Sequence, residues 1–363
     1  MLRMGTTRDD NYALFGTVGT GLGQGAGFTA LEWARAQFVE YCGIDPHPGT
    51  LNVTVEDASH RDVWKAICGT MGLKVRAPSP DACDATLYPL SIGYTRNTGR
   101  GLVAAAVVPH VPGYADNQIE IIAAVNLRDH FRLEDGAPLG LRLHERRSIS
   151  AAIFDVDGTL LNSLDGYHVA ASRATAEYGY TVSLEHVRRA LNTNQPFWDF
   201  IIPDGEPRDD RRISELREAT MKHWPDALAE VVRVLPGVGD ALERLRSAGV
   251  RLAIYTGSGG ESFPPLREAG LIELFEVVVT GNDVARRKPD PQGIDRALAE
   301  LGVGPRDAAY IGDSCIDVGA SLGAGVMSIA VLTGAGDSAT LSVAGAERIV
   351  AHAGGIPDLF KLG

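Results

Sequence analysis

Short apolar runs alternate with polar turns along the chain, and three of these runs end in polar side chains. The three runs are residues 151–154, residues 251–255, in which the apolar residues follow Arg251, and residues 309–311. Uninterrupted apolar runs of this length are typical of strands buried in a parallel sheet. Open α/β sheets bind their ligands beyond the carboxyl ends of such strands. The pattern therefore predicts an α/β domain with a polar cleft at these strand ends.

Two carboxylates follow the first run. Asp155 and Asp157 are two residues apart, so they project to the same face of a strand, and Gly158 lets the backbone turn away from them. Such a pair suits phosphoryl chemistry, because one carboxylate can attack phosphorus while the other protonates the leaving oxygen and later activates water. A metal ion is needed to neutralise the crowded anions. Taken alone, the segment also fits a polar strand end before a turn.

Further polar side chains follow in the order that this chemistry requires. Thr256, after the second run, can hydrogen-bond a phosphoryl oxygen, and Lys288 can balance the charge of an aspartyl-phosphate. Asp313 and Asp317, after the third run, can complete an oxygen-rich Mg²⁺ site. Each has an ordinary explanation by itself, such as a solvated basic loop or an acidic helix start. Their common order predicts a phosphate pocket.

Residues 151 to about 333 resemble the phosphatases of the haloacid dehalogenase superfamily, whose four motifs are present in order. The resemblance implies a Rossmann-like α/β fold with an inserted cap. It implies one role for each motif residue: Asp155 as nucleophile, Asp157 as general acid and base, Thr256 as phosphate ligand and Lys288 as charge-balancing lysine. It also implies an Mg²⁺ ion held by Asp155, the Asp157 carbonyl and Asp313, with Asp317 as a further support.

The residues after Thr256 depart slightly from that family. Gly257 stands where the family often has asparagine, which leaves the role of the threonine hydroxyl intact. We expect Gly257 and Ser258 to lie on the substrate side of the phosphate pocket.

A long segment, residues 162–252, separates the first two motifs and exceeds a plain crossover between strands. Within it, residues 166–178 and 209–223 have the apolar spacing of helices. We therefore expect a helical cap over about residues 166–245, as the resemblance also implies. Residues 192–199 are the candidate segment of the cap that leans over the site, with Asn194 as its substrate-binding residue, and a loop that merely joins two cap helices is the alternative.

The first 147 residues show many short apolar runs between turns, which is typical of a β structure. They open with residues 15–27, a segment too rich in glycine for a strand or helix interior. We expect a loop whose backbone amides can cradle phosphate groups, although it lacks the Gly-Lys-Ser/Thr ending of a P-loop. A dinucleotide fingerprint and a flexible hinge are the alternatives.

Thr50 and Asn52 follow a proline-glycine turn at alternating positions of a strand, so both side chains face one way, as neutral oxygen ligands of Mg²⁺ would. Ordinary turn residues are the alternative. With the glycine-rich segment, they resemble the archaeal-type CTP-dependent riboflavin kinases. The resemblance implies a small β-barrel, CTP as phosphate donor, Mg²⁺ on Thr50 and Asn52, and Glu120 near the flavin. It also implies a nucleotide-binding loop, whose residues are Gly19, Gly21, Gly23, Gln24 and Gly25.

Two positions depart from that kinase family. Gln24 stands where glutamate is usual, and Ala137 stands where aspartate is usual. They favour an alternative in which the first domain only binds CTP or a flavin and regulates the phosphatase. In a third possibility, the first domain supplies the contacts of a homodimer.

The 363 residues exceed the usual size of one domain, and the charged segment 143–149 divides a domain of residues 1–147 from one of residues 148–363. The net charge of -12 argues against nucleic acid and anionic membranes as partners. Four scattered cysteines and a polar N-terminal segment favour the cytoplasm.

The sequence therefore predicts a bifunctional enzyme: a kinase of riboflavin or a related polyol, joined to a hydrolase of small phosphate esters. Because a kinase and a phosphatase acting on the same flavin would be futile, we expect the hydrolase to act on a precursor, such as the phosphorylated ribitylamino-pyrimidine of riboflavin synthesis. FMN is the competing substrate.

Overall fold

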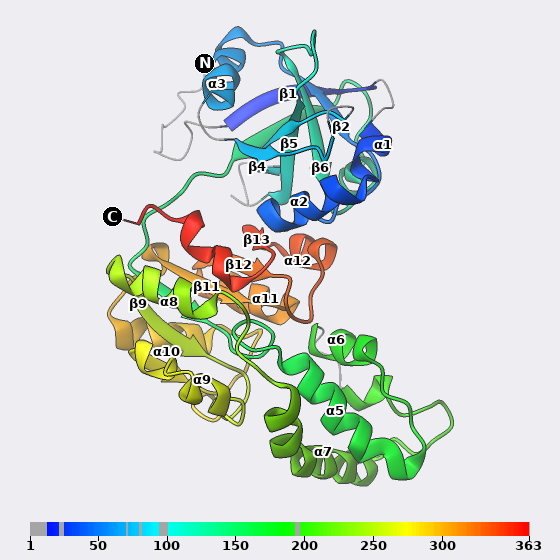
Figure 1. The fold of residues 1–363 in the computed structure, drawn as a ribbon, viewed down its shortest axis with the longest axis vertical. Helices are drawn as coiled ribbons and strands as arrows, with labels where there is room; N and C mark the ends of the chain where they lie inside the picture. The colour runs from blue at the N-terminus through cyan, green and yellow to red at the C-terminus, as the bar shows by residue number, and fades with distance from the viewer. Residues whose placement is uncertain are drawn as a thin grey trace. The chain divides into compact units, whose positions relative to one another are not determined.

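The computed structural model of the protein describes residues 13–21, 25–69, 72–79, 82–93, 101–192 and 197–362. Contacts between Cα atoms divide the chain into two compact units (Figure 1). The first consists of residues 1–145 and 345–349, and the second of residues 146–344 and 350–363. None of the described helices combines the length and the apolar character of a bilayer span.

The first unit is an antiparallel β-barrel, which confirms the predicted fold class. Its strands run in the order β4-β5-β6-β2-β1-β7, and β7 pairs back onto β4, so the barrel closes. The remaining strand, β3, pairs with the first half of β4, while β7 pairs with the second half. The strands are β1 (Ala13–Gly19), β2 (Leu51–Thr54), β3 (Leu73–Val75), β4 (Ala85–Ile92), β5 (Leu102–Pro109), β6 (Gln118–Ala123) and β7 (Pro138–Leu143).

Alternate side chains of the strands fill the barrel. In β2, Leu51 and Val53 are buried, whereas Asn52 and Thr54 are partly exposed. This is the period of two expected of a strand with one apolar face. The helices of this unit are α1 (Gly25–Thr29), α2 (Glu32–Cys42), α3 (Ala58–Cys68) and α4 (Leu127–Phe131). The side chain of Asp57 begins α3 by accepting hydrogen bonds from the first free backbone amides.

The second unit is built on a parallel sheet, which also confirms the predicted fold class. Strands β10, β9, β8, β11 and β12 lie side by side in that order, and each pairing is parallel. Successive residues of β8 are buried on opposite faces, because Ala152 and Phe154 belong to one apolar core and Ala151 and Ile153 to another. The strands are β8 (Ala151–Phe154), β9 (Arg251–Tyr255), β10 (Val277–Val279), β11 (Ala308–Gly312) and β12 (Met327–Val331). A short strand, β13 (Arg348–Val350), lies where the two units divide.

Helices cover both faces of this sheet, as expected of an α/β unit whose strands are apolar throughout. They are α8 (Val238–Ser247), α9 (Pro264–Glu268), α10 (Gln292–Leu301), α11 (Cys315–Ala324) and α12 (Ser338–Ala344). The short 3₁₀ helices of the unit are η2 (Ala176–Tyr178), η3 (Phe197–Phe200), η4 (Ile272–Leu274), η5 (Pro305–Asp307) and η6 (Ala353–Leu359). The buried side chains of α8 belong to the core of the sheet.

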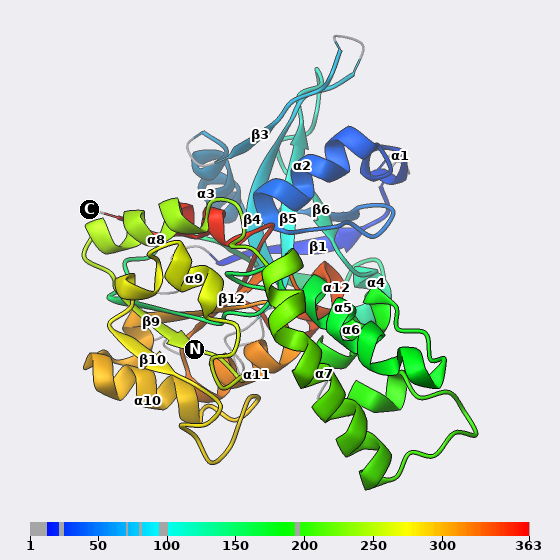
Figure 2. The ribbon, with the colours of Figure 1, turned by 60° about the horizontal axis from the view of Figure 1, so that its bottom comes forward.

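A helical cap is inserted between β8 and β9. It consists of α5 (Ser163–Thr175), α6 (Leu184–Asn192) and α7 (Asp210–Val231). Figures 1 and 2 show these green helices as a group beside the sheet. The cap has its own apolar cluster, which includes Trp198 and Leu216.

The two connections to the cap run together. The backbone amide of Asn162 donates to the carbonyl of Arg233 at 3.1 Å, and that of Leu235 donates to the carbonyl of Leu160 at 2.9 Å. Leu161 forms an antiparallel bridge with Val234 between them. The chain therefore enters and leaves the cap through one short two-stranded ribbon.

Candidate functional site

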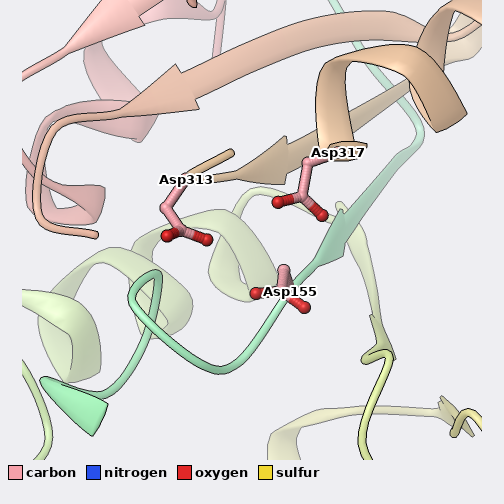
Figure 3. A group of neighbouring side chains, drawn as sticks. All are labelled: Asp155, Asp313 and Asp317. Atoms are coloured by element: carbon pink, nitrogen blue, oxygen red, sulfur yellow. The ribbon is translucent and has the colours of Figure 1, made fainter. Parts of the chain in front are cut away.

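Three buried carboxylates meet at the carboxyl ends of β8 and β11. Asp155 follows β8, Asp313 follows β11, and Asp317 lies in the first turn of α11. One oxygen of each lies within 4.8 Å of those of the other two, and all three side chains are buried (Figure 3). The parallel sheet brings them together because its neighbouring strands end at the same edge.

Backbone amides orient two of these carboxylates. Asp317 accepts a hydrogen bond from the amide of Ser314 at 3.1 Å, as part of the capping box that begins α11. Asp313 Oδ2 accepts one from the amide of Ala335 at 2.6 Å. A Cβ atom on Gly334 would lie 1.9 Å from that same oxygen, so only glycine leaves room for the carboxylate there.

Lys288 is the buried counter-charge of this cluster. Its Nζ donates to Oδ1 of Asp155 and to Oδ1 of Asp317, each at 2.6 Å, and its side chain is 9% exposed. Burial alone would lower the pKa of Lys288, but the two carboxylates raise it well above its ordinary value. Burial raises the pKa of Asp155, and the ammonium group opposes that rise.

Tyr310, on β11, is a site residue that the sequence analysis missed. Its hydroxyl accepts from Nζ of Lys288 at 3.0 Å and lies 3.0 Å from Oδ1 of Asp317 and 3.1 Å from the backbone oxygen of Tyr255. The side chain is almost completely buried. In the sequence this tyrosine looks like one more member of an apolar strand. Only its position two residues before Gly312 indicates that it lies close to Asp313 and Asp317.

Asp157 lies near this group, and one of its two carboxylate oxygens has no hydrogen-bond partner among the described residues. This oxygen, Oδ1, is buried, and the hydroxyls of Ser163 and Ser262 beside it also have no partner among those residues. Burial raises the pKa of Asp157, whereas the two serines oppose the rise. Burial thus shifts the pKa of this carboxyl group in the direction that a general acid requires.

The loop after β9 carries the predicted phosphate ligand. Thr256 is buried, and its hydroxyl lies 3.0 Å from that of Ser258 and accepts from the Ser258 amide at 3.2 Å. A Cβ atom on Gly257 would lie 3.7 Å from Cε of Lys288, so this loop adjoins the lysine. The loop can therefore present hydroxyl and amide donors to an anion beside Lys288. Asn194, the predicted cap residue, lies outside the described residues.

The acidic cluster fits Mg²⁺. Carboxylate oxygens are the ligands that this hard cation prefers, and three of them converge here from the ends of two strands and one helix. The cluster carries more negative charge than the single ammonium group of Lys288 can balance, so a divalent cation would complete its neutralisation.

In the barrel, the glycine-rich segment packs against the two predicted metal ligands. Gly19 ends β1 opposite Asn52, and Gly25 begins α1. A Cβ atom on Gly21 would lie 2.1 Å from Nδ2 of Asn52, and one on Gly25 would lie 2.3 Å from Oγ1 of Thr50. A side chain at either position would therefore displace Asn52 or Thr50 from its present place. Gly23 and Gln24, which belong to the same predicted loop, lie outside the described residues.

The side chains of β2 and β6 also meet here. The Thr50 hydroxyl donates to Oε2 of Glu120 at 3.1 Å, and Oδ1 of Asn52 accepts from Gln118 at 2.8 Å. The structure thus brings Thr50 and Glu120 into direct contact and places Asn52 opposite Glu120 in the strand register.

A pocket adjoins Thr50. Its walls are the turn before β2, the end of β6 and the start of α4, and its lining residues are His47, Pro48, Gly49, Thr50, Leu51, Ile121, Ala123, Val125, Asn126, Leu127 and Arg128. Nη2 of Arg128 donates to the carbonyl of Gly19 at 3.0 Å and to Asp135 at 2.7 Å. The pocket therefore joins apolar walls and a guanidinium group to the end of the glycine-rich segment, a combination suited to a ring system that carries phosphate.

Two family models match the chain, one in each part. The family model of haloacid dehalogenase-like hydrolases matches residues 152–331. A second model, of a domain of unknown function that is designated the CTP-dependent riboflavin kinase domain, matches residues 18–143.

Relatives and solved structures agree with the first match. A phosphoglycolate phosphatase of Cereibacter sphaeroides is 30% identical over 213 residues, which are 58% of this chain and 96% of the relative. One of Nitrosospira multiformis is 32% identical over 200 residues, which are 50% of this chain and 83% of the relative. A haloacid dehalogenase-like hydrolase structure from Bacteroides fragilis superposes on 58% of this chain and 100% of its own, with a TM-score of 0.52 and 25% identity. Residues 18–143 match the second model, and the chain belongs to the haloacid dehalogenase-like hydrolases.

Proposed function

We propose that the second unit is an Mg²⁺-dependent phosphatase that forms an aspartyl-phosphate, an acyl phosphate, on Asp155, and that the first unit transfers phosphate from CTP to riboflavin or a related polyol. The observation that carries the phosphatase is the position of Lys288, which bridges Asp155 and Asp317 at 2.6 Å in a buried site. The relatives named phosphoglycolate phosphatases support hydrolysis of a phosphate monoester.

In the first half of the reaction, an oxygen of Asp155 attacks phosphorus, and the bond between phosphorus and the leaving oxygen breaks. Asp157 gives its proton to that oxygen, so the alcohol leaves neutral. Thr256, Gly257 and Ser258 hold the phosphoryl oxygens through hydroxyl and amide donors, and Lys288 balances the charge on Asp155.

In the second half, Asp157 takes a proton from a water molecule, whose oxygen attacks the same phosphorus. The bond from phosphorus to Asp155 breaks, which releases inorganic phosphate and restores both carboxyl groups. Asp155, the Asp157 carbonyl and Asp313 would hold Mg²⁺, with Asp317 in support. The bound cation would supply positive charge to the phosphoryl oxygens.

The substrate of the phosphatase is proposed from the fusion and from the relatives. A phosphorylated precursor of riboflavin, FMN and phosphoglycolate are the three candidates to compare. If the barrel is a riboflavin kinase, hydrolysis of FMN would reverse its reaction. Hydrolysis of a precursor would not create this futile cycle. We expect the highest kcat/KM for the precursor, and a profile that ignores both the precursor and FMN would contradict the link to flavins.

Several contacts support the kinase proposal. The glycine-rich segment packs onto Thr50 and Asn52, Glu120 accepts from Thr50, and a pocket adjoins these residues. In this proposal Thr50 and Asn52 bind Mg²⁺, the loop of Gly19 to Gly25 binds CTP, and Glu120 lies near the acceptor. The second candidate is a module that binds CTP or a flavin without transfer, which Gln24 and Ala137 favour.

The decisive test uses the Asp155→Asn variant, which cannot hydrolyse a phosphorylated product. The variant is incubated with Mg²⁺, riboflavin and either CTP or ATP, and mass spectrometry follows FMN and CDP. FMN formed with CTP alone would establish the kinase. Intact CTP that nevertheless binds the protein would favour the regulatory module. Parallel assays of the native protein and of Asp155→Asn with p-nitrophenyl phosphate test the phosphatase activity, which the substitution should abolish.

We also propose that the enzyme works in the cytoplasm on small molecules. All four cysteines are unpaired, as expected in a reducing compartment. The acidic net charge makes nucleic acid an unsuitable partner. A homodimer formed through the first unit is tested by the molar mass of the purified protein.

A further inference from the structure

Asn192, the last residue of cap helix α6, makes its hydrogen bonds outside the cap. Its Oδ1 accepts from the backbone amide of Cys315 at 2.9 Å, and its Nδ2 lies 3.4 Å from Oγ1 of Thr340. The orientation of the amide follows from the first contact, because a backbone N–H can only donate. The side chain is buried, with 9% exposed.

The first contact satisfies a donor that α11 cannot satisfy alone. The first amides of a helix have no partner within the helix. In α11, the Ser314 hydroxyl accepts from the amide of Asp317, and Asn192 accepts from that of Cys315. The cap thus supplies a capping oxygen to a helix of the sheet unit.

The same turn carries the acidic cluster. Asp317 lies two residues after Cys315, and it contacts Lys288 at 2.6 Å, which in turn contacts Asp155 at 2.6 Å. Thr340, the other partner of Asn192, lies in the first turn of α12, which follows Ala335 and Gly336, and the amides of these two residues both donate to Asp313. Asn192 therefore touches the two segments that fix Asp317 and Asp313.

We infer that Asn192 is a positioning residue that latches the closed cap onto the metal-binding turn and fixes Asp313 and Asp317 when it does so. A buried amide must be hydrogen-bonded to be stable, and both contacts of Asn192 form only when the cap lies on the sheet unit. The cap therefore closes and residues 313–317 become ordered at the same time. This inference rests on the proposed phosphatase only for its effect on catalysis.

The latch is tested first without catalysis, by hydrogen exchange of the full-length protein in Mg²⁺, read by mass spectrometry on peptides that contain residues 315–317. Asn192→Ala should speed exchange there by about fivefold to tenfold, the equivalent of one net hydrogen bond. Asn192→Asp keeps the oxygen that faces Cys315, and a carboxylate at a helix N-terminus is favourable, so exchange should stay within about threefold of the native rate.

His168→Ala is the matched control. His168 also belongs to the cap, but its ring hydrogen-bonds the carbonyl of Val182 within the cap, at 2.9 Å. This variant loosens the cap without removing the latch, so exchange of residues 315–317 should not change. Unchanged exchange in Asn192→Ala, or equal acceleration in His168→Ala, would overturn the inference.

Activity gives the second readout. In Asn192→Ala, kcat should fall about tenfold with little change in KM, because the latch orders Asp317 and Lys288 and not the ester. Asn192→Asp should recover most of this loss. If the native protein hydrolyses no ester but the exchange results hold, the proposed phosphatase fails and the latch stands. If kcat is unchanged in Asn192→Ala, the latch has no part in positioning and the inference fails.

Discussion

The hydroxyl of Tyr310 accepts a hydrogen bond from Nζ of Lys288 at 3.0 Å, deep in the site between Asp155 and Asp317. The lysine also lies over the rings of Tyr255 and Tyr310, with Nζ 5.4 Å and 5.7 Å from the ring centroids. The ammonium group of Lys288 thus contacts two aromatic rings and a hydroxyl group. These contacts restrict the long, flexible side chain to one position.

Tyr310→Phe should lower both stability and turnover. The substitution removes the hydroxyl that joins Lys288, Asp317 and the Tyr255 carbonyl, and a hydrogen bond lost from a buried site costs about 1–3 kcal/mol. Urea unfolding measures the first effect, and kcat with p-nitrophenyl phosphate measures the second.

Tyr255→Phe is the control for Tyr310→Phe. The hydroxyl of Tyr255 is buried and has no hydrogen-bond partner among the described residues, so its removal should leave stability unchanged or increase it. If Tyr310→Phe and Tyr255→Phe lost equal stability and equal kcat, the hydrogen bonds of the Tyr310 hydroxyl would have no specific effect.

Gly334→Ala should weaken Mg²⁺ binding. The added Cβ would lie 1.9 Å from Oδ2 of Asp313, so the carboxylate must move away from the amide of Ala335. We expect affinity to fall by about tenfold or more, as measured by calorimetric titration with Mg²⁺. Gly304→Ala makes the same change on the surface, where the nearest atom would be 3.9 Å away, and should bind Mg²⁺ normally.

The stability of the metal-free protein should depend on pH through Asp313. Burial and the neighbouring Asp317 raise the pKa of Asp313 from 3.8 to about 7. Between these values the folded protein holds a proton that the unfolded chain lacks, so this residue makes the protein less stable as the pH rises. The slope is at most about 1.4 kcal/mol per pH unit.

Urea unfolding in EDTA, from about pH 8 to about pH 5, measures this effect. The native protein should gain more stability on acidification than Asp313→Asn, which has no such proton to bind. Identical slopes for the two proteins would mean that Asp313 titrates normally.

Thr50→Ala should weaken the binding of CTP in the presence of Mg²⁺ by about tenfold or more, because it removes a proposed metal ligand beside the glycine-rich segment. Thr54→Ala is the matched control, since Thr54 lies on the same face of β2 as Asn52, whereas Thr50 directly precedes that strand. Calorimetric titration compares the two variants without requiring kinase turnover. Equal affinities would remove Thr50 from the nucleotide site.

The fold could be predicted from sequence where its signals are local. The apolar runs at residues 151–154, 251–255 and 309–311 predicted a parallel sheet, and β8, β9 and β11 occupy them. The closure of the barrel could not be predicted from periodicity, because it depends on β7 pairing with β4 across a long stretch of chain. Only the family resemblance indicated a barrel.

The candidate site divides in the same way. Asp155, Lys288, Asp313 and Asp317 stand in short motifs at strand ends, and the structure brings all four together; their roles stay predictions. Tyr310 could not be found in this way, and Asn192 was indicated only as the first residue of a candidate cap segment, without its contact. The hydroxyl of Tyr310 is hidden in an apolar strand, and the contact of Asn192 joins residues 123 positions apart.

The paired connections of the cap have a consequence for how this protein can change. Since the chain leaves the sheet unit at Leu161 and returns beside it at Val234, the two ends are already neighbours, and a turn could join them as readily as three helices do. Any insertion whose ends meet can occupy this place without altering the strands that carry the carboxylates. The cap can therefore be exchanged over evolution or by design without altering those strands, provided that the new insertion also supplies an acceptor for the amide of Cys315, as Asn192 does.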